Sequence, residues 1–211
     1  MQVWFARFPA LRELTIGQHE LRFRDQRDWD DQFRYQRFGQ DYSAAAVASF
    51  VASALTPHIT PDITDTIVVN VRRGDYYTHD HLRSRYAFDQ AGYVRAALGH
   101  VDPASHVRLV SDDPDWCRQH LDSVLREAAD SVTYDPPGAI DNFTAVASSR
   151  RLVGTNSTFS YWGGYVAAEL HDDPQVVMPR FHARGENSSD AYQLDPRWTI
   201  LDGFTGPGVA D

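Results

Sequence analysis

Two adjacent arginines stand where an apolar stretch of the chain ends, and their side chains suit the binding of an anion. The stretch TIVVNV, residues 66–71, has the β-branched composition of a buried strand, and Arg72 and Arg73 follow it directly. Each guanidinium carries several N–H donors in a planar fork that matches a diphosphate or a carboxylate. Gly74 would let the backbone turn, and Asp75 could orient an arginine or act on a substrate. The alternative is an Arg–Asp pair that only terminates the strand.

A second polar stretch, GTNSTFSYWGG at residues 154–164, could complete the same anion site. Its small residues lead into an expected helix capped by Ser157, and free backbone N–H groups at a helix start bind anions with help from the helix dipole. Amide and hydroxyl side chains would add donors: Asn156, Ser157, Thr158 and Ser160. The alternative is a helix cap and nothing more. The sequence lacks the glycine-rich loops of P-loop ATPases and of dinucleotide-binding enzymes, so both classes are disfavoured.

Two acids, Asp112 and Asp113, follow another strand-like stretch, HVRLVS at residues 106–111. Paired carboxylates could hold Mg²⁺ around a diphosphate. Asp113 is also the expected cap of the next helix, and nearby arginines would already neutralise the phosphate charge, so we expect no metal. The nine histidines show no spacing typical of zinc ligands. His79 and His81 are expected in an exposed loop.

The segments that must position these clusters alternate between strand and helix patterns. The expected strands span residues 66–71, 106–111, 131–134, 151–154 and 175–179. The expected helices span residues 43–55, 89–100, 113–125, 141–149 and 157–171, with Ser43, Asp113, Asp141 and Ser157 as caps. This order predicts an α/β fold with a Rossmann-like parallel sheet and helices on both faces. Ligands bind beyond the carboxyl ends of such strands, so the clusters at 70–75, 111–113 and 155–160 should meet there.

Composition narrows the classes of function. The chain has 211 residues with a net charge of −9, and its 20 basic residues are all arginine. This acidity argues against a nucleic-acid surface, which needs clustered cations. No apolar run approaches the ~18 residues of a membrane span. The lone cysteine, Cys117, favours a reducing, cytoplasmic location, and we expect it to pack inside a helix rather than to act as a nucleophile.

Three ordered blocks of this sequence resemble glycosyltransferase family 11, the bacterial and animal α-1,2-fucosyltransferases. The family's strand ends in His-Val-Arg-Arg-Gly-Asp-Tyr, where this chain has NVRRGDY. The family's Ser-Asp-Asp-x-x-Trp-Cys block is SDDPDWC here, and its Asp-led helix and Asn-Ser-Ser/Thr-Phe-Ser-Trp-Trp block are DNFTAVASS and TNSTFSYWGGY. The resemblance covers residues 30–203 and is strongest over residues 66–165.

The resemblance implies an inverting, metal-independent enzyme that needs no cofactor and moves L-fucose from GDP-fucose to a galactose hydroxyl of a glycan in α-1,2 linkage. The implied catalytic residues are Arg72 and Arg73 on the diphosphate and Asp75 as the base. Asp141 would bind the guanine, and charge that develops on the leaving GDP would be stabilised electrostatically. The implied donor-binding residues are Asn70, Arg72, Arg73, Gly74, Ser111, Asp112, Asp141, Asn156, Ser157, Thr158, Phe159 and Ser160.

The chain departs from the family pattern in two places. Asn70 stands where the family has a histidine, and an amide can donate a hydrogen bond but cannot shuttle protons. The family's N-terminal Gly-Gly-Leu-Gly-Asn-Gln-Met-Phe segment, which builds the other lobe of a GT-B enzyme, does not occur in this sequence. We therefore expect a GT-B donor-binding lobe with a partial or missing N-terminal lobe. The expected divisions are a partial acceptor-side helical region at 1–60, a Rossmann-like GDP-binding domain at 61–205 and a disordered tail at 206–211.

The expected partners are a GDP-sugar donor and a glycan acceptor, with no nucleic acid and no transmembrane segment. Peripheral contact with the inner membrane stays open for a cytoplasmic protein of this kind. Two other classes of function also stay open. One is a catalytically inactive GDP-sugar-binding lobe, and the other is a structural protein whose arginine doublet pairs with internal acids. The sequence predicts neither the acceptor nor the oligomeric state.

Overall fold

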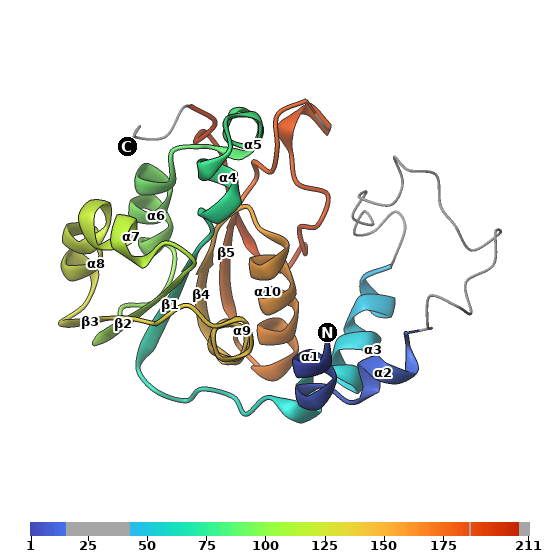
Figure 1. The fold of residues 1–211 in the computed structure, drawn as a ribbon. Helices are drawn as coiled ribbons and strands as arrows, with labels where there is room; N and C mark the ends of the chain where they lie inside the picture. The colour runs from blue at the N-terminus through green and yellow to red at the C-terminus, as the bar shows by residue number, and fades with distance from the viewer. Residues whose placement is uncertain (16–42, 186, 207–211) are drawn as a thin grey trace.

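A parallel β-sheet forms the centre of the molecule (Figure 1). The computed structural model describes residues 1–15, 43–185 and 187–206, and the sheet within them has six strands. The strands are β1 (Thr66–Val71), β2 (His106–Ser111), β3 (Ser131–Tyr134), β4 (Arg151–Gly154), β5 (Gln175–Pro179) and β6 (Thr199–Leu201). Neighbouring strands pair in parallel, in the order β3-β2-β1-β4-β5-β6. The predicted α/β fold with a parallel sheet is confirmed, although the prediction did not include β6.

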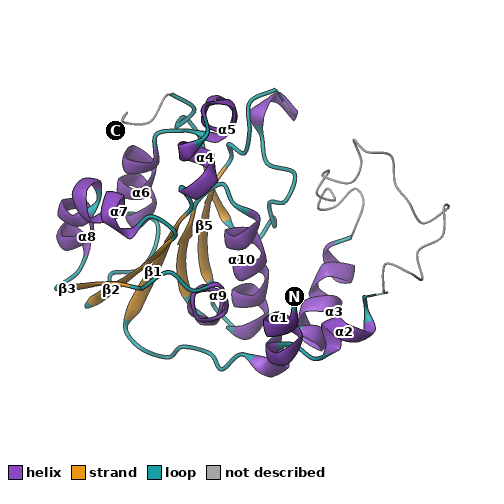
Figure 2. Cartoon of the chain, in the orientation of Figure 1, coloured by secondary structure: helices purple, strands orange, loops and turns teal. Residues whose placement is uncertain are grey.

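Helices lie on both sides of the sheet (Figure 2). The α-helices are α1 (Gln2–Arg7), α2 (Ala10–Glu13), α3 (Ala44–Ala54), α4 (Gly74–Thr78), α5 (Asp80–Tyr86), α6 (Gln90–Leu98), α7 (Pro114–His120), α8 (Asp122–Ala128), α9 (Ala139–Ser148) and α10 (Thr158–Leu170). Two short 3-10 helices, η3 (Thr56–His58) and η4 (Asn187–Ser189), complete the helical elements of the described residues.

The side chains of the strands pack into two separate hydrophobic cores. In β1, Val68 packs into one core and Val69 into the other, because successive side chains of a strand point to opposite faces. The α10-side core joins the sheet to α3, α9 and α10, and the α6-side core joins it to α6, α7 and α8. Figure 1 shows these two groups of helices on opposite sides of the strands. With both faces covered, β1 is buried along nearly its whole length and four of its six residues are apolar, as expected of a doubly covered parallel strand.

The first helix of the chain packs onto the α10-side core. Phe8, which ends α1, is fully buried in that core together with Val51 of α3 and Val146 of α9. The ring of Trp4 meets the ring of Phe143 edge-on at 5.4 Å between centroids. Residues on both sides of the expected division at 60/61 therefore share one core. The division itself stays a prediction.

The strand order reverses beside β1. Strands β2 and β3 lie on one side of β1, and β4, β5 and β6 lie on the other. In open α/β sheets a reversal of this kind opens a crevice beyond the carboxyl ends of the strands, where ligands bind. The residues that leave the carboxyl end of β1 begin with Arg72, so the fold brings the arginine doublet to this crevice.

Several predicted helices differ from the observed ones in detail. The expected helix 113–125 is divided at Leu121 into α7 and α8, although hydrogen bonds join Leu121 N–H to Cys117 O and Leu125 N–H to Leu121 O across the division. Helix α9 begins at Ala139 after Gly138 and has no side-chain cap, so the prediction that Asp141 caps it is wrong. Asp141 instead occupies the first turn, where the negative carboxylate interacts favourably with the positive end of the helix dipole.

The other predicted helix caps agree with the structure, whereas one predicted loop does not. The predicted caps Ser43, Asp113 and Ser157 are confirmed, since each side chain accepts a backbone N–H of the next turn. The expected loop around His79 and His81 forms the start of α5. The tail predicted at 206–211 lies outside the described residues apart from Gly206.

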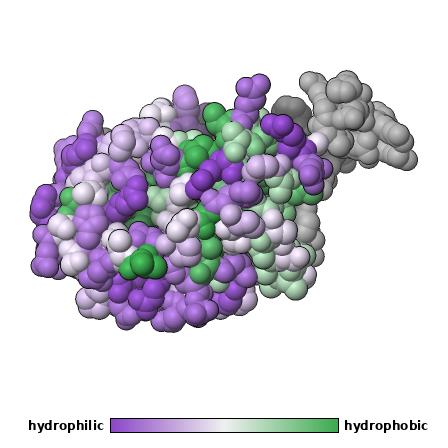
Figure 3. Space-filling view, turned by 90° about the horizontal axis from the view of Figure 1, so that it is seen from below, coloured by the Kyte–Doolittle hydropathy of each residue, from purple (hydrophilic) through white to green (hydrophobic). Residues whose placement is uncertain are grey.

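The face of the molecule that Figure 3 shows is mostly hydrophilic, with apolar side chains near its centre and at its right. Seen from below, Figure 3 shows purple side chains over much of this face and pale green ones at the right, where Figure 1 places the N-terminal helices. Large exposed apolar side chains include Met1, Val3, Leu14 and Trp162. Within the described residues, no helix is long and apolar enough to span a membrane.

Replacing Phe8 with alanine tests whether the first helix is part of the main core. Because Phe8 is fully buried, Phe8→Ala should lower the free energy of unfolding by about 3 kcal/mol. Val3→Ala, in the same helix at a side chain that is 60% exposed, should change it by less than about 0.5 kcal/mol. Urea unfolding of both variants measures the difference. Equal stabilities would contradict the shared core.

Candidate functional site

The three polar clusters meet at the carboxyl edge of the sheet, as predicted. The first cluster follows β1, the second follows β2 and the third follows β4. Hydrogen bonds tie the first cluster to the other two: Arg72 N–H to Thr155 Oγ1 at 2.9 Å, Arg73 N–H to Asp112 Oδ1 at 2.8 Å and Ser160 Oγ–H to Asn70 Oδ1 at 2.6 Å. Segments that are far apart in the sequence therefore form one connected polar network.

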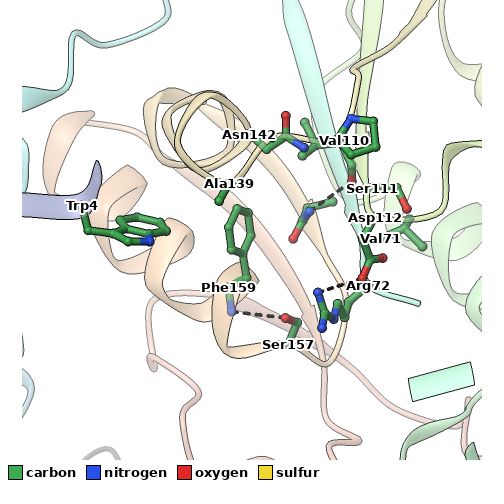
Figure 4. Close-up of a pocket in the computed structure, with 13 residues that line it drawn as sticks. Trp4, Val71, Arg72, Val110, Ser111, Asp112, Ala139, Asn142, Ser157 and Phe159 are labelled. Atoms are coloured by element: carbon green, nitrogen blue, oxygen red, sulfur yellow. Dashed lines mark hydrogen bonds and ion pairs between the residues drawn. The ribbon is translucent and has the colours of Figure 1, made fainter. Parts of the chain in front are cut away.

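A cavity of about 290 Å³, here called the edge pocket, opens beside this network (Figure 4). Its walls come from the ends of β1 and β2, the loop before α9, the start of α10 and helix α1. The lining residues are Asn70, Val71, Arg72, Val110, Ser111, Asp112, Pro137, Gly138, Ala139, Asn142, Ser157, Phe159 and Trp4. Figure 4 shows Arg72 and Asp112 on one side of the pocket and Phe159 and Trp4 toward the other.

Arg72 is the cation of the edge pocket. Its Nη1 lies 2.8 Å from Asp112 Oδ2, and its Nη2 lies 2.6 Å from Asp75 Oδ1. Burial opposes the charge on Arg72, but attraction to Asp112 and the hydrogen bond to Asp75 outweigh burial and raise its pKa. The guanidinium is thus charged at any ordinary pH. Its side chain remains 37% exposed, so an anion in the pocket can reach it.

Arg73 takes the opposite direction and does not line the edge pocket. Its guanidinium lies between the rings of Tyr77 and Trp116, at 3.9 and 3.7 Å from their centroids, and only 3% of its side chain is exposed. Its Nε is 3.2 Å from Asp113 Oδ2. These contacts hold the Arg73 side chain away from the edge pocket, which is why the doublet separates. We expected both guanidinium groups to face one diphosphate, but only Arg72 lines the edge pocket.

Asp112 holds the turn after β1 in place. It accepts the Arg73 backbone N–H and pairs with the Arg72 side chain. Gly74 has a φ of +23°, and a Cβ at this position would lie 2.3 Å from Asp112 Oδ2. A glycine is therefore needed here for both its backbone conformation and its lack of a side chain. Asp75 accepts a hydrogen bond from Arg72 at 2.6 Å, so Arg72 is the arginine that it orients.

The turn into α10 contributes two residues to the edge pocket. Ser157 accepts the Phe159 N–H at 3.2 Å, and both residues line the cavity. Thr158 lies between them in sequence but lines a neighbouring cavity instead. This turn thus presents the helix start to the pocket, as expected, through Ser157 rather than through all of its polar side chains.

Asn156 and Ser160 support this turn from inside. Asn156 is fully buried, and its Nδ2 donates to the backbone oxygens of Tyr86 at 2.9 Å and His182 at 2.8 Å. Ser160 is fully buried against Asn70, whose Nδ2 donates to the backbone oxygen of Val110 at 3.1 Å. Asn156 and Ser160 were predicted to bind the sugar donor. They instead fix the backbone around the edge pocket and do not line it.

The loop before α9 places its polar residues differently from the prediction. Asp141, the expected guanine ligand, is exposed and does not line the edge pocket. Its neighbour Asn142 does line it, and the favoured orientation of its amide donates to Pro136 O at 3.2 Å and accepts from Gly138 N–H at 3.3 Å. Asn142 therefore both shapes the loop and faces the cavity.

Trp4 is one of the pocket residues that the sequence reasoning missed. It reaches the edge pocket from the start of the chain and packs edge-on against Phe143. One signal was present in the sequence, since Trp4, Phe8 and Leu11 follow the spacing of an apolar helix face. The spacing predicts a helix but not the element against which it packs.

Other reactive side chains have inert surroundings. Burial raises the pKa of Cys117 to about 12, so its thiol is not a nucleophile near neutral pH. In the part of the chain that the structure describes, no group of three or more His, Cys, Asp or Glu side chains could hold a metal ion.

A buried histidine behind the Asn156 turn, His182, makes the stability of the folded chain depend on pH. Burial, with a smaller contribution from Arg85, lowers the pKa of His182 from 6.5 to about 4, and its Nδ1 lies 3.2 Å from the Tyr161 hydroxyl. The unfolded chain therefore binds a proton before the folded chain does. The contribution of His182 to stability is complete above pH 6.5 and is lost as the pH falls to about 4.

Urea unfolding at several pH values tests this coupling. From pH 7 to pH 4, the free energy of unfolding should fall by about 3 kcal/mol more in the wild type than in His182→Gln. The exposed His100 supplies the control, because His100→Gln should keep the wild-type pH profile. Parallel profiles for the wild type and His182→Gln would contradict a buried, neutral His182.

Comparison with known proteins gives relatives that match part of the chain. The O-antigen biosynthesis glycosyltransferase WbnK of Escherichia coli is 25% identical over 59% of this chain and 41% of its own length. The galactoside 2-alpha-L-fucosyltransferase SEC1 of Bos taurus is 28% identical over 47% of this chain and 28% of its own. The alpha-1,2-colitosyltransferase of Escherichia coli is 22% identical over 48% of this chain and 36% of its own. No solved structure is significantly similar to the chain.

These matches cover less than half of each relative's length, from 28% to 41%. The model of Glycosyl transferase family 11 matches residues 35–199, which is well over half of the chain and includes the polar clusters after β1, β2 and β4. The chain therefore belongs to Glycosyl transferase family 11.

Proposed function

We propose that this chain binds GDP-L-fucose in the edge pocket and transfers fucose to a galactose hydroxyl of a glycan, forming an α-1,2 linkage with inversion and without a metal ion. The observation that carries the proposal is the charged Arg72, which faces a cavity at the sheet edge of a family 11 chain. The names of two relatives support the linkage, since both specify transfer to position 2 or an α-1,2 bond.

The diphosphate of the donor fits between Arg72 and the start of α10. Arg72 offers a planar fork of N–H donors on one side of the edge pocket. Ser157 and Phe159, at the start of the 13-residue helix α10, line another wall, and the start of this helix carries the positive end of its dipole. The nucleobase would then reach the wall of Gly138, Ala139 and Asn142. Asp141, in the same turn of α9, stays the predicted guanine ligand.

Binding of a diphosphate requires Arg72 to exchange partners. In the present structure Asp112 and Asp75 satisfy its guanidinium. A diphosphate carries more charge than either carboxylate, and its oxygens can take over one edge of the fork. Asp112 keeps its bond to the Arg73 N–H in either state, so the loop need not move. Arg73 acts in this proposal as a positioning residue, held between Tyr77 and Trp116.

The reaction itself is a single displacement. The acceptor hydroxyl oxygen attacks the anomeric carbon of fucose from the face opposite to GDP, and the bond from that carbon to the phosphate oxygen breaks. The electron pair of that bond leaves with GDP, where Arg72 and the α10 N–H groups stabilise the charge. The proton of the hydroxyl passes to a base on the acceptor's side of the sugar. The resemblance implies Asp75 for this role; its side chain is 48% exposed, pairs with Arg72 and does not line the edge pocket, so the assignment stays a prediction for the Asp75→Asn variant to test. One displacement inverts the anomeric configuration.

An assay of GDP release tests the proposed function. The protein is incubated with a β-galactoside and either GDP-L-fucose or the corresponding colitose donor, since the relatives' names include both sugars. We expect release with GDP-L-fucose, unchanged by EDTA, and an α-1,2 linkage in the product by NMR. GDP binding without release would support the inactive GDP-sugar-binding lobe. Neither binding nor release would contradict a nucleotide site altogether.

Removal of the Arg72 charge should weaken GDP binding. Arg72→Gln deletes a charge-assisted contact, and we expect the Kd for GDP from calorimetry to rise about 10- to 100-fold. Arg83→Gln is the matched control, because Arg83 pairs with Asp80 at 2.6 Å and i,i+3 spacing, as Arg72 does with Asp75. Arg83→Gln should retain wild-type affinity. Equal affinity in both variants would place the diphosphate elsewhere.

Neutralisation of Asp75 should slow transfer more than it weakens donor binding. If Asp75 is the base, Asp75→Asn should lower kcat by about 10²- to 10⁴-fold, with a change of only a few-fold in the Kd for GDP. The exposed Asp80 gives the control, Asp80→Asn, which should keep the wild-type kcat. A wild-type kcat in Asp75→Asn would leave Asp75 only the role of orienting Arg72.

A further inference from the structure

A second cavity lies against the edge pocket on the side of the N-terminal helices. We call it the aromatic cavity, and its volume is about 340 Å³. This size falls within the range of roughly 300–1,000 Å³ that is usual for ligand pockets. Most of its lining is aromatic: Trp4, Phe8, Phe50, Phe143, Phe159 and Trp162. These side chains come from α1, α3, α9 and α10, so the cavity exists only because the start of the chain packs onto the sheet domain.

The two cavities share a wall. Trp4 and Phe159 line both of them. Phe143 contacts each of these rings edge-on, at 5.4 Å from Trp4 and 5.6 Å from Phe159 between centroids. Figure 4 shows Phe159 and Trp4 on the side of the edge pocket away from Arg72 and Asp112. A ligand in the aromatic cavity would therefore lie directly beside a donor in the edge pocket.

The lining of the aromatic cavity selects for an uncharged, apolar ligand. Among the described residues, nine line the cavity; none of these nine is charged, and of them only Thr158 carries a hydroxyl. A sugar ring buried here would leave most of its hydroxyl groups without partners, which is costly. An aryl ring or alkyl chain has no such cost and gains from contact with aromatic faces.

The mouth of the cavity carries an exposed aromatic side chain. Trp162 is 39% exposed and meets the ring of Phe50 edge-on at 5.6 Å. Its ring also meets Tyr165 at 5.5 Å, so it is held in place. An apolar ligand that enters beside Trp162 would cover part of this surface.

We propose that the aromatic cavity binds the apolar aglycone of the acceptor, with the galactose ring at the shared wall formed by Trp4 and Phe159. The inference rests on the proposed transferase function, because a transferase must hold two substrates in adjacent sites. The wall that the two cavities share supplies that adjacency. The acceptor class is thus a β-galactoside linked to an aryl or alkyl group.

A series of acceptors tests the proposal. Methyl, p-nitrophenyl and octyl β-D-galactoside differ only in the aglycone and are used below the micellar concentration of the octyl compound. With GDP-L-fucose, the octyl acceptor should have a KM lower than that of the methyl acceptor by on the order of 100-fold. Similar kcat values are expected, because the aglycone is remote from the reacting hydroxyl.

Substitution at the mouth separates this cavity from a general preference for apolar compounds. Trp162→Ala should reduce the octyl-to-methyl preference about tenfold, and Trp162→Phe should restore most of it. Ile63→Ala is the control, since Ile63 is 93% exposed and lies outside both cavities. An unchanged preference in Trp162→Ala would overturn the proposal.

A binding measurement keeps this test independent of turnover. Tryptophan fluorescence in the presence of GDP reports the Kd values of octyl and methyl β-galactoside, while calorimetry reports GDP itself. If no acceptor is fucosylated but octyl β-galactoside binds more tightly and loses that advantage in Trp162→Ala, the cavity is supported and the transferase function is not. Equal Kd values for the two galactosides would overturn the cavity proposal even if transfer is observed.

Discussion

The carboxylate of Asp112 is the contact on which the arrangement of the site depends. It accepts the Arg73 backbone N–H and pairs with the Arg72 guanidinium, and so ties the end of β1 to the end of β2. This arrangement is possible only because Gly74 has no Cβ to displace the carboxylate. One side chain thus fixes both the backbone turn and the direction of the pocket's cation. The bond to a backbone N–H does not depend on a ligand, so the turn keeps its shape when Arg72 changes partners.

The separation of the arginine doublet assigns different physical roles to two identical side chains. Arg73 stacks between two aromatic rings, where cation–π contact offsets part of the cost of burying its charge. Arg72 remains partly exposed with carboxylates that are also partly exposed, at 28% for Asp112 and 48% for Asp75. Ion pairs in such surroundings contribute only about 0–1 kcal/mol. In the proposed complex, replacing one carboxylate partner of Arg72 with a diphosphate would therefore cost little free energy. The two carboxylates position the guanidinium but do not prevent it from binding another anion.

The sequence was sufficient for five of the six strands and for the edge where the polar clusters meet, because both follow from local pattern. Apolar strands alternating with helices determine a parallel sheet, and the polar residues after β1, β2 and β4 must then meet at one edge. The direction of Arg73 could not be predicted, because it depends on Tyr77 and Trp116 from other elements. The position of Trp4 in the pocket could not be predicted either, because it depends on a tertiary contact with Phe143.

The N-terminal helix has a larger part in the site than its length suggests. Phe8 anchors it in the α10-side core, and Trp4, one turn earlier, stands between the two cavities. Trp4 and Phe159 line both cavities and both pack against Phe143, so a shift of either shared ring alters both walls. A ligand that displaces either shared ring in one cavity would therefore change the free energy of ligand binding in the other, and by reciprocity the effect would be equal in both directions.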